Sequence, residues 1–259
     1  MAYDELPQSP YEEPETLNEN RYARRLRRTV WLLALSSLLN IALAGWAVQR
    51  FWKPSRNSYE NGFETDLKAV KSSISLVKMR FDGGVKIDKN GTFVQDQIVG
   101  GRKYTGKPSL AVDLSWFELL SGLNIDLSGD DADGLAEHTL QWPDSDKYFS
   151  GLEVFHSLHC LNRLRQALYP EHYSYLFKDP KDPSKEDHID HCIEHLRQAI
   201  QCHADLTPMH WARVDNAVLL KTDTEHTCRD FDSIWNWAKS RRADIDNIWL
   251  KNGTLHIVD

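Results

Sequence analysis

The sequence lacks the motifs of several large protein classes. It contains neither a glycine-rich phosphate-binding loop nor the G-x-S-x-G turn that carries a nucleophilic serine, so neither kind of site is predicted. Excess positive charge is also absent. The formal net charge of the 259 residues is −7, which excludes the basic footprint of a nucleic-acid-binding protein. No C-x-x-C pair occurs, which makes a thiol redox protein the least favoured alternative.

Cysteine is scarce and unevenly distributed, whereas histidine and tryptophan are abundant. The chain has 11 histidines and 9 tryptophans. Any disulfide or thiolate chemistry belongs to the last hundred residues, because all four cysteines lie there: Cys160, Cys192, Cys202 and Cys228.

Charge is missing altogether from residues 30–48, an apolar run that would span about 30 Å as a helix, the thickness of a bilayer core. Five arginines lie between residues 21 and 28, whereas only Arg50 and Lys53 follow closely. The positive-inside rule therefore predicts a single-pass type II membrane protein with its domain in the lumen of the secretory pathway. A cleaved signal peptide is the alternative. The apolar run exceeds the usual core of about 7–15 residues, and the region before it is long.

Two N-x-T sequons, at Asn90 and Asn252, support this orientation because both follow the apolar run. A lumenal domain is exposed to an oxidising environment, in which cysteines tend to pair as disulfides.

The composition divides the chain into four parts. Residues 1–29 are predicted to be a disordered cytoplasmic tail, 30–48 a transmembrane helix, 49–78 a stalk with a loose helical period, and 79–259 a compact lumenal domain. The predicted fold is mainly α with minor β. The expected helices cover residues 111–120 with Ser115 as a possible cap, 156–169, 184–202 opened by a capping box at Ser184, and 229–241. Residues 85–87 and 92–94 are expected to be short strands or loops, and 148–155 a strand or an extended lead-in to the next helix.

The acidic run at residues 129–134 is predicted to be a solvated loop, since it does not match the twelve-residue calcium loop of an EF-hand.

A thirteen-residue segment occurs twice. HSLHCLNRLRQAL at 156–168 and HIDHCIEHLRQAI at 188–200 share seven identities at an offset of 32, including both histidines and the cysteine. Positions i, i+3 and i+4 share one face of a helix, so each copy presents two imidazoles and one sulfur on the same side. If the two helices pack antiparallel, these faces meet, and the sequence predicts a metal site whose ligands are His156, His159, His188 and His191.

The cysteines are expected to form disulfides rather than to bind the metal, because thiolates are readily oxidised in the lumen. Cys160–Cys192 would clamp the two helices, and Cys202–Cys228 would attach the last helix. Four cysteines allow three pairings, however, and spacing does not choose among them. A closed structural zinc site is the main alternative for the metal.

Several neighbouring residues have ordinary explanations. His195, at i+4 from His191, is a spare ligand or a partner of one, and Asp187 and Asp190 either orient an imidazole or cap the helix. Tryptophans that could line a pocket, although core packing is the commoner role, are Trp116, Trp142 and Trp211. Histidines without a partner at ligand spacing are His138, His172, His210, His226 and His256.

The segments EVFHSLHCLNRLR (153–165), HIDHCIEHLRQAIQCHADLTP (188–208) and HTCRDFDSIWNWA (226–238) resemble the UstYa-like family of fungal mycotoxin-biosynthesis proteins. The resemblance covers the apolar run and most of residues 105–240, and both His-x-x-His-Cys motifs are complete. It implies a membrane-anchored oxidase with copper as the metal. The reaction would be oxidative cyclisation, hydroxylation, dehydrogenation or halogenation of a secondary metabolite or peptide.

By the same resemblance, the four motif histidines would be the catalytic core, and a second family member is a candidate partner in a hetero-oligomer. A non-catalytic membrane scaffold with structural zinc is the competing hypothesis. No nucleic-acid partner is expected.

The topology can be tested by glycosylation. In a eukaryotic host, endoglycosidase treatment should increase the gel mobility of the protein, and Asn90→Gln with Asn252→Gln should abolish that change. Digestion of the domain by protease added to intact microsomes would contradict a lumenal location.

Overall fold

The computed structural model describes residues 15–51, 57–95, 101–245, 249–250 and 253–254. The chain divides into two compact units, residues 1–56 and 57–259, which are described separately. The first contains helix α1 (Glu15–Phe51), and its part Asn20–Arg50 is long and apolar enough to cross a membrane, by length and composition. Large apolar side chains such as Trp31 and Leu32 are exposed along it. The predicted apolar helix at 30–48 lies within these bounds.

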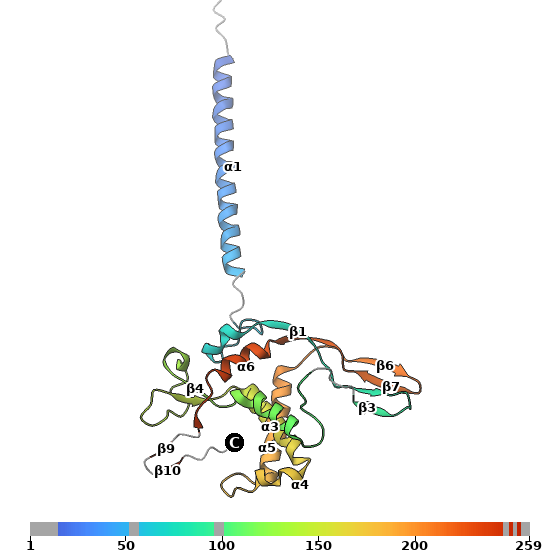
Figure 1. Cartoon of the computed structure of the whole chain (residues 1–259). Coiled ribbons are helices and arrows are strands. Elements are labelled where there is room, and N and C mark those ends of the chain that lie inside the picture. Colours follow the sequence, from blue (N-terminus) through green and yellow to red (C-terminus); the bar gives the residue numbers. More distant parts are fainter. Residues whose placement is uncertain (1–14, 52–56, 96–100, 246–248, 251–252, 255–259) are drawn as a thin grey trace, which may run out of the picture. The chain divides into compact units, whose positions relative to one another are not determined.

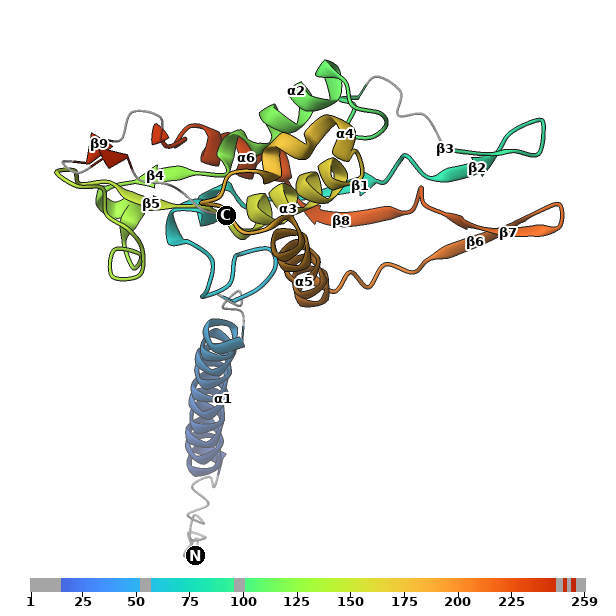
Figure 2. The same ribbon diagram turned by 90° about the horizontal axis from the view of Figure 1, so that it is seen from below.

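The second unit is mainly helical with short antiparallel strand pairs, as predicted (Figures 1 and 2). Its α-helices are α2 (Leu110–Leu119), α3 (Glu153–Ala167), α4 (Pro170–Tyr173), α5 (Lys185–His203) and α6 (Phe231–Lys239). Its 3-10 helices are η1 (Lys68–Ser73), η2 (Leu120–Gly122), η3 (Gly129–Ala132) and η4 (Ser174–Phe177). The strand pairs are β1 (Leu76–Arg80) with β8 (Glu225–Arg229), β2 (Val85–Ile87) with β3 (Phe93–Gln95), β4 (Ile125–Leu127) with β5 (Tyr148–Ser150), β6 (His210–Val214) with β7 (Ala217–Lys221), and β9 (Trp249–Leu250) with β10 (Gly253–Thr254).

Two local predictions differ from the structure. Helix α2 is capped by Ser109, whose Oγ accepts from the backbone N–H of Val112, whereas Ser115 lies inside the helix and donates to the carbonyl of Ala111. The strand expected at 148–155 ends at Ser150, because the helical pattern of the first motif already begins at Glu153. The helix boundaries at Ser184 and near Pro170 agree with the predictions.

The segment predicted as a stalk contributes to the domain. Its residues from 57 onward belong to the second compact unit, and η1 packs against α6 with Val70 buried. Strand β1 then pairs antiparallel with β8, bringing Val77 opposite Cys228. Leu67, Val70 and Ile74 therefore belong to the 3-10 helix η1 and the two positions that flank it. They do not form part of an isolated helical stalk.

The main core lies where β4, α3 and α6 meet. Its buried members are Ile125, Leu127, Ala132, Phe155 and Ala238. Packing here is tight enough to require a glycine on η2. A Cβ added at Gly122 would lie 2.7 Å from the Cβ of Ala238 and 3.0 Å from the Phe155 ring. The core thereby fixes the first turn of α3, which carries the first motif.

The β2–β3 and β6–β7 hairpins extend beyond the helices in both views (Figures 1 and 2), and β2 contacts β7. The segment that joins α5 to β6 is attached to β8 by a hydrogen bond. The Asp205 carboxylate accepts it from Nδ1 of His226 at 2.7 Å. Hydrogen bonds from Thr207 and from His226 lower the pKa of Asp205 from 3.8 to about 2. The sequence analysis did not predict β6, β7 or β8.

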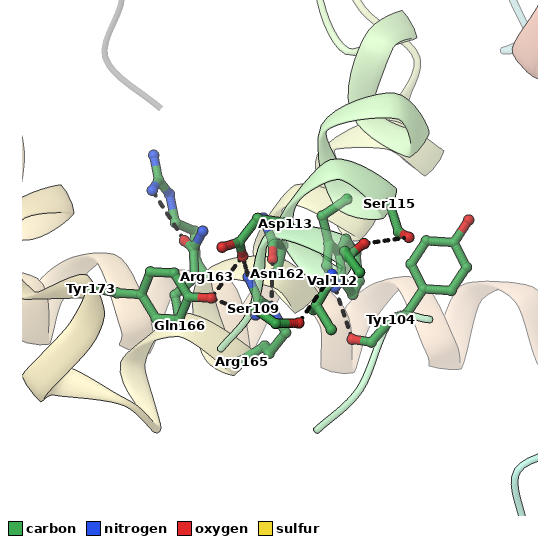
Figure 3. Close-up of polar contacts among 12 residues, drawn as sticks. Tyr104, Ser109, Val112, Asp113, Ser115, Asn162, Arg163, Arg165, Gln166 and Tyr173 are labelled. Carbon is green, nitrogen blue, oxygen red and sulfur yellow. Dashed lines mark hydrogen bonds and ion pairs between the residues drawn. The ribbon is translucent and has the colours of Figure 1, made fainter. Parts of the chain in front are cut away.

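A polar network docks α2 onto α3 and α4 (Figure 3). The Asp113 carboxylate accepts from the Tyr173 hydroxyl at 2.7 Å and from the Arg165 guanidinium at 3.0 Å. Arg165 also donates to Asn162 at 2.9 Å. Burial, followed by the hydrogen bond to Asp113, raises the pKa of Tyr173. Helix α3, which carries the first motif, is thus held on one side by a partly buried hydrogen-bond network.

Removing the carboxylate at the centre of this network should destabilise the domain. Asp113→Ala leaves two largely buried donors, on Arg165 and Tyr173, without their acceptor, which costs about 1–3 kcal/mol. Glu118→Ala on the same helix is the control, because its ion pair with Lys239 is partly exposed to solvent and leaves no buried donor unpaired, so it contributes less than about 1 kcal/mol. Urea unfolding followed by circular dichroism measures both, and equal losses would contradict the assignment.

Candidate functional site

The two motifs lie on α3 and α5, which pack against each other (Figure 1). Helix α5 begins at a well-formed cap: the Ser184 hydroxyl accepts from the backbone N–H of Asp187 and donates to its carboxylate at 2.7 Å. Asp187 therefore caps the helix, as the ordinary interpretation of this acid predicted. Helix α3 has an acid, Glu153, in its first turn, where it interacts favourably with the helix dipole.

The motif histidines meet in two pairs at the crossing of the helices. The Nε2 atoms of His156 and His191 are 3.3 Å apart, and their ring centroids are 5.4 Å apart. The rings of His159 and His188 stack with centroids 5.9 Å apart. Each pair joins the first histidine of one motif to the second of the other, so the helices run in opposite senses, as the sequence analysis required.

The two pairs differ in their access to solvent. His159 and His188 are buried, whereas the His156 side chain is 27% exposed and His191 is exposed. The two motif cysteines, Cys160 and Cys192, are completely buried. The predicted four-histidine set is therefore arranged as one accessible pair and one enclosed pair.

The accessible pair has the geometry of a metal-binding set. Among the described residues, ligand atoms of His156, Cys160 and His191 all lie within 4.8 Å of one another. Two nitrogens bound at ~2.0–2.1 Å to one tetrahedral ion would be roughly 3.3–3.4 Å apart, which matches the Nε2 separation. Two imidazoles and a sulfur are donors that copper and zinc both accept, so the donor set fits either metal.

Two further side chains extend this end of the crossing. Glu153 Oε2 lies 3.4 Å from His156 Nδ1 and 3.9 Å from His195 Nε2. The His195 ring is 4.1 Å from that of His156, and its Nε2 is hydrogen-bonded to the Ser157 hydroxyl at 2.9 Å. Glu153, His156 and His195 form a second set of possible ligands within 4.8 Å. Sequence reasoning missed Glu153, although its position three residues before His156 places it on the motif face.

A cleft of about 1370 Å³ opens beside the accessible pair. Glu153, Ser157, His191 and His195 contribute to its wall. The rest of the wall is largely apolar and comes from η1, α5 and α6, with Val70, Ile74, Leu196, Ala199, Phe231 and Ile234 among its residues. The other two cysteines, Cys202 and Cys228, also line this cleft.

Other predicted residues lie away from this cleft or in ordinary roles. Trp116 and Trp142 are core residues with exposures of 5% and 6%, and Trp211 is exposed on β6. Asn90 is exposed in the turn between β2 and β3, where a glycan could be attached, and Asn252 and His256 lie outside the described residues. In the acidic run, Asp131 and Asp133 make ion pairs with Arg241 and Lys68.

Comparison with known proteins identifies relatives. The profile of the family described as "Mycotoxin biosynthesis protein UstYa" matches residues 18–241. The chain is 32% identical over 260 residues to UstYa family oxidase phomYd of Diaporthe leptostromiformis, covering 92% of this chain and 83% of that protein. It is 44% identical over 95 residues to UstYa family oxidase VicYb of Bipolaris victoriae, covering 35% of this chain and 78% of that protein.

A shorter match is to oxidase ustYa of Aspergillus flavus, 39% identical over 93 residues, covering 35% of this chain and 41% of that protein. No solved structure matches the chain. The profile spans both histidine motifs and most of the chain. The similarity to phomYd extends over nearly the whole length of this chain. The chain belongs to the UstYa family of mycotoxin-biosynthesis proteins.

Proposed function

We propose that this chain is a membrane-anchored, copper-dependent oxidase that modifies a fungal secondary metabolite or peptide toxin. The observation that carries the proposal is the 3.3 Å contact between the Nε2 atoms of His156 and His191 at the edge of a large cleft. The family supports the oxidative chemistry, since relatives such as phomYd and ustYa are named oxidases. Oxidative cyclisation, hydroxylation, dehydrogenation and halogenation are the candidate reactions.

The metal would be held by imidazoles of the duplicated motif, among which His156 and His191 form the accessible pair. Imidazole nitrogens bind copper well, and the accessible pair already has a suitable separation. Copper bound there would supply one-electron redox chemistry with oxygen. The chain's own contribution is to fix the imidazoles on two packed helices, so that their positions do not depend on a flexible loop.

The cleft would hold the substrate. Its volume of about 1370 Å³ exceeds the ~300–1,000 Å³ of most small-molecule pockets, which suits a peptide or a large metabolite. Apolar side chains of η1 and α6 would bind the substrate's hydrophobic surface. His191 and His195 on the wall would then place the reacting bond next to the metal.

Helix α1 would anchor the enzyme in the membrane. Its length and composition suit a single span, and the arginine cluster at residues 21–28 favours a cytoplasmic N-terminus. The catalytic domain would then lie in the lumen as that of a type II membrane protein, where a second family member could join it as a hetero-oligomer.

A non-catalytic scaffold with a structural zinc ion is the second candidate. The burial of His159, His188 and both motif cysteines favours it, because structural zinc sites are closed to solvent. Electron paramagnetic resonance of the purified chain separates the two, since Cu(II) gives a signal and Zn(II) is silent.

Replacing a histidine of the accessible pair should abolish activity without unfolding the domain. His156→Ala or His191→Ala each removes one imidazole, so metal content and product formation should be lost while circular dichroism and membrane localisation are retained. His172→Ala, at an exposed position on α4, should change little. Product formation is measured in a host that supplies the remaining pathway.

Two results would count against the oxidase proposal. Misfolding of both ligand variants would favour structural zinc, because such a metal contributes folding free energy directly. Full activity of a folded variant lacking both His156 and His191 would exclude the catalytic role.

The sulfur chemistry is a separate prediction. If Cys160 and Cys192 are bridged, non-reducing peptide mapping should find their peptides linked, and loss of the bridge should cost roughly 2–4 kcal/mol. Cys202 and Cys228, which share the cleft wall, are the second expected pair. Reduced thiols at Cys160 and Cys192 in the native protein would instead make Cys160 a third ligand beside His156 and His191.

A further inference from the structure

The two helices cross with the pattern of a two-fold axis between them. The offset of 32 that relates the repeats converts His156 into His188 and His159 into His191. It therefore converts the pair His156–His191 into the pair His188–His159. The two ends of the crossing thus consist of corresponding positions of the repeat. Any difference in metal binding between them must come from the side chains around the two histidine pairs.

Those surrounding side chains have opposite charge at the two ends. Glu153 on α3 and His195 on α5 flank the His156–His191 pair. The same offset places Lys185 at the position equivalent to Glu153, and Arg163 at the position equivalent to His195. An acid and an imidazole at one end therefore correspond to two cations at the other.

Arg163 contacts the enclosed pair directly, and Lys185 lies near Phe177, an aromatic neighbour of that pair. Arg163 Nε donates to His159 Nε2 at 3.3 Å, so that nitrogen already accepts a proton donor. The Arg163 guanidinium and the Lys185 ammonium both lie 6.0 Å from the ring of Phe177, whose centroid is 6.4 Å from that of His188. Arginine stays charged at all physiological pH values, so this end carries a permanent positive charge.

The acid at the first end has the opposite effect. Glu153 faces Nδ1 of His156, and a carboxylate that accepts the Nδ1–H proton directs the other nitrogen, Nε2, toward a metal. Nε2 of His156 is the atom that faces His191. A metal cation at this end is thus attracted by a nearby carboxylate, whereas at the other end it would be repelled by the Arg163 guanidinium that contacts His159.

We propose that the duplicated motif binds one metal ion, at the His156–His191 end, and that Arg163 and Lys185 close the other end to metal. Glu153 is a positioning residue that orients His156, and His195 completes the metal-binding end on the cleft side. The histidines of the enclosed pair then pack the crossing instead of binding the ion. The inference rests on the proposed function for the presence of a metal, and it goes further in assigning where and how many ions bind.

Exchanging the side chains at the two ends tests this directly. The full chain in detergent is dialysed against Cu(II), and bound copper is counted per chain by atomic emission. The wild type should bind one ion. Arg163→His with Lys185→Glu gives the second end the residues of the first and should raise the number to two. Glu153→Lys with His195→Arg gives the first end the residues of the second and should reduce it to none.

The control makes the same chemical changes elsewhere on the domain. Arg242→His with Lys89→Glu, the latter in the exposed turn between β2 and β3, replaces one arginine and one lysine away from the crossing and should leave one ion bound. Two ions in the wild type, or one ion in the Arg163/Lys185 variant, would overturn the proposal. A wild type that makes product without any bound metal would instead exclude the proposed copper oxidase, so the two failures are distinguishable.

Milder variants decide the matter if the double variants do not fold. Glu153→Gln should weaken Cu(II) binding ~10–100-fold, as loss of a partner that orients a ligand does, and should alter the Cu(II) paramagnetic spectrum. Glu153→Asp should restore part of the affinity, and Glu186→Gln in the first turn of α5 should change neither. Unchanged affinity and spectrum in Glu153→Gln, or loss of copper in His159→Ala equal to that in His156→Ala, would overturn the assignment.

Discussion

The crossing of α3 and α5 is the contact on which the rest of the domain depends. Two completely buried cysteines and two buried histidines lie at this crossing, so the helices meet through small and polar side chains instead of a row of leucines. Such a contact has little tolerance for sliding, because a shift of one turn would separate each imidazole from its partner. The Asp113–Arg165–Tyr173 network and the core around Phe155 hold α3 from its other sides. The geometry of the site is therefore set by packing on several faces of α3.

Much of this arrangement was predictable because the chemistry is repeated in the chain. The seven identities between the motifs indicated two helices with matching faces, and the capping pattern at Ser184 located the start of α5. The antiparallel pairing was an assumption of the predicted site, and the contacts between His156 and His191 and between His159 and His188 agree with it. What the repeat could not show was which residues around it had diverged. Glu153, Arg163 and Lys185 lie outside the identities, and their roles depend on contacts between the helices.

The strands were harder to predict for a different reason. Strand β1 pairs with β8 across about 150 residues of sequence, and no local pattern in either segment indicates a partner so distant. The hydrophobic spacing at residues 67–74 suggested a stalk because it repeats at helical intervals, although tertiary contacts of η1 with α6 account for it. The predicted cap of α2 was wrong by six residues. Ser109 and Ser115 are both plausible N-caps by residue type, and only the observed start of the helix distinguishes them.

The whole histidine crossing is encoded in one contiguous stretch, from Glu153 at the start of α3 to His203 at the end of α5. Closing a loop of this length costs little entropy, whereas the β1–β8 pairing must close one of about 150 residues. During synthesis the helical hairpin emerges from the ribosome before β8 does. Domains that form from local contacts fold early and quickly. Loop-closure entropy therefore favours the formation of the crossing before the β1–β8 pairing that closes the body of the domain.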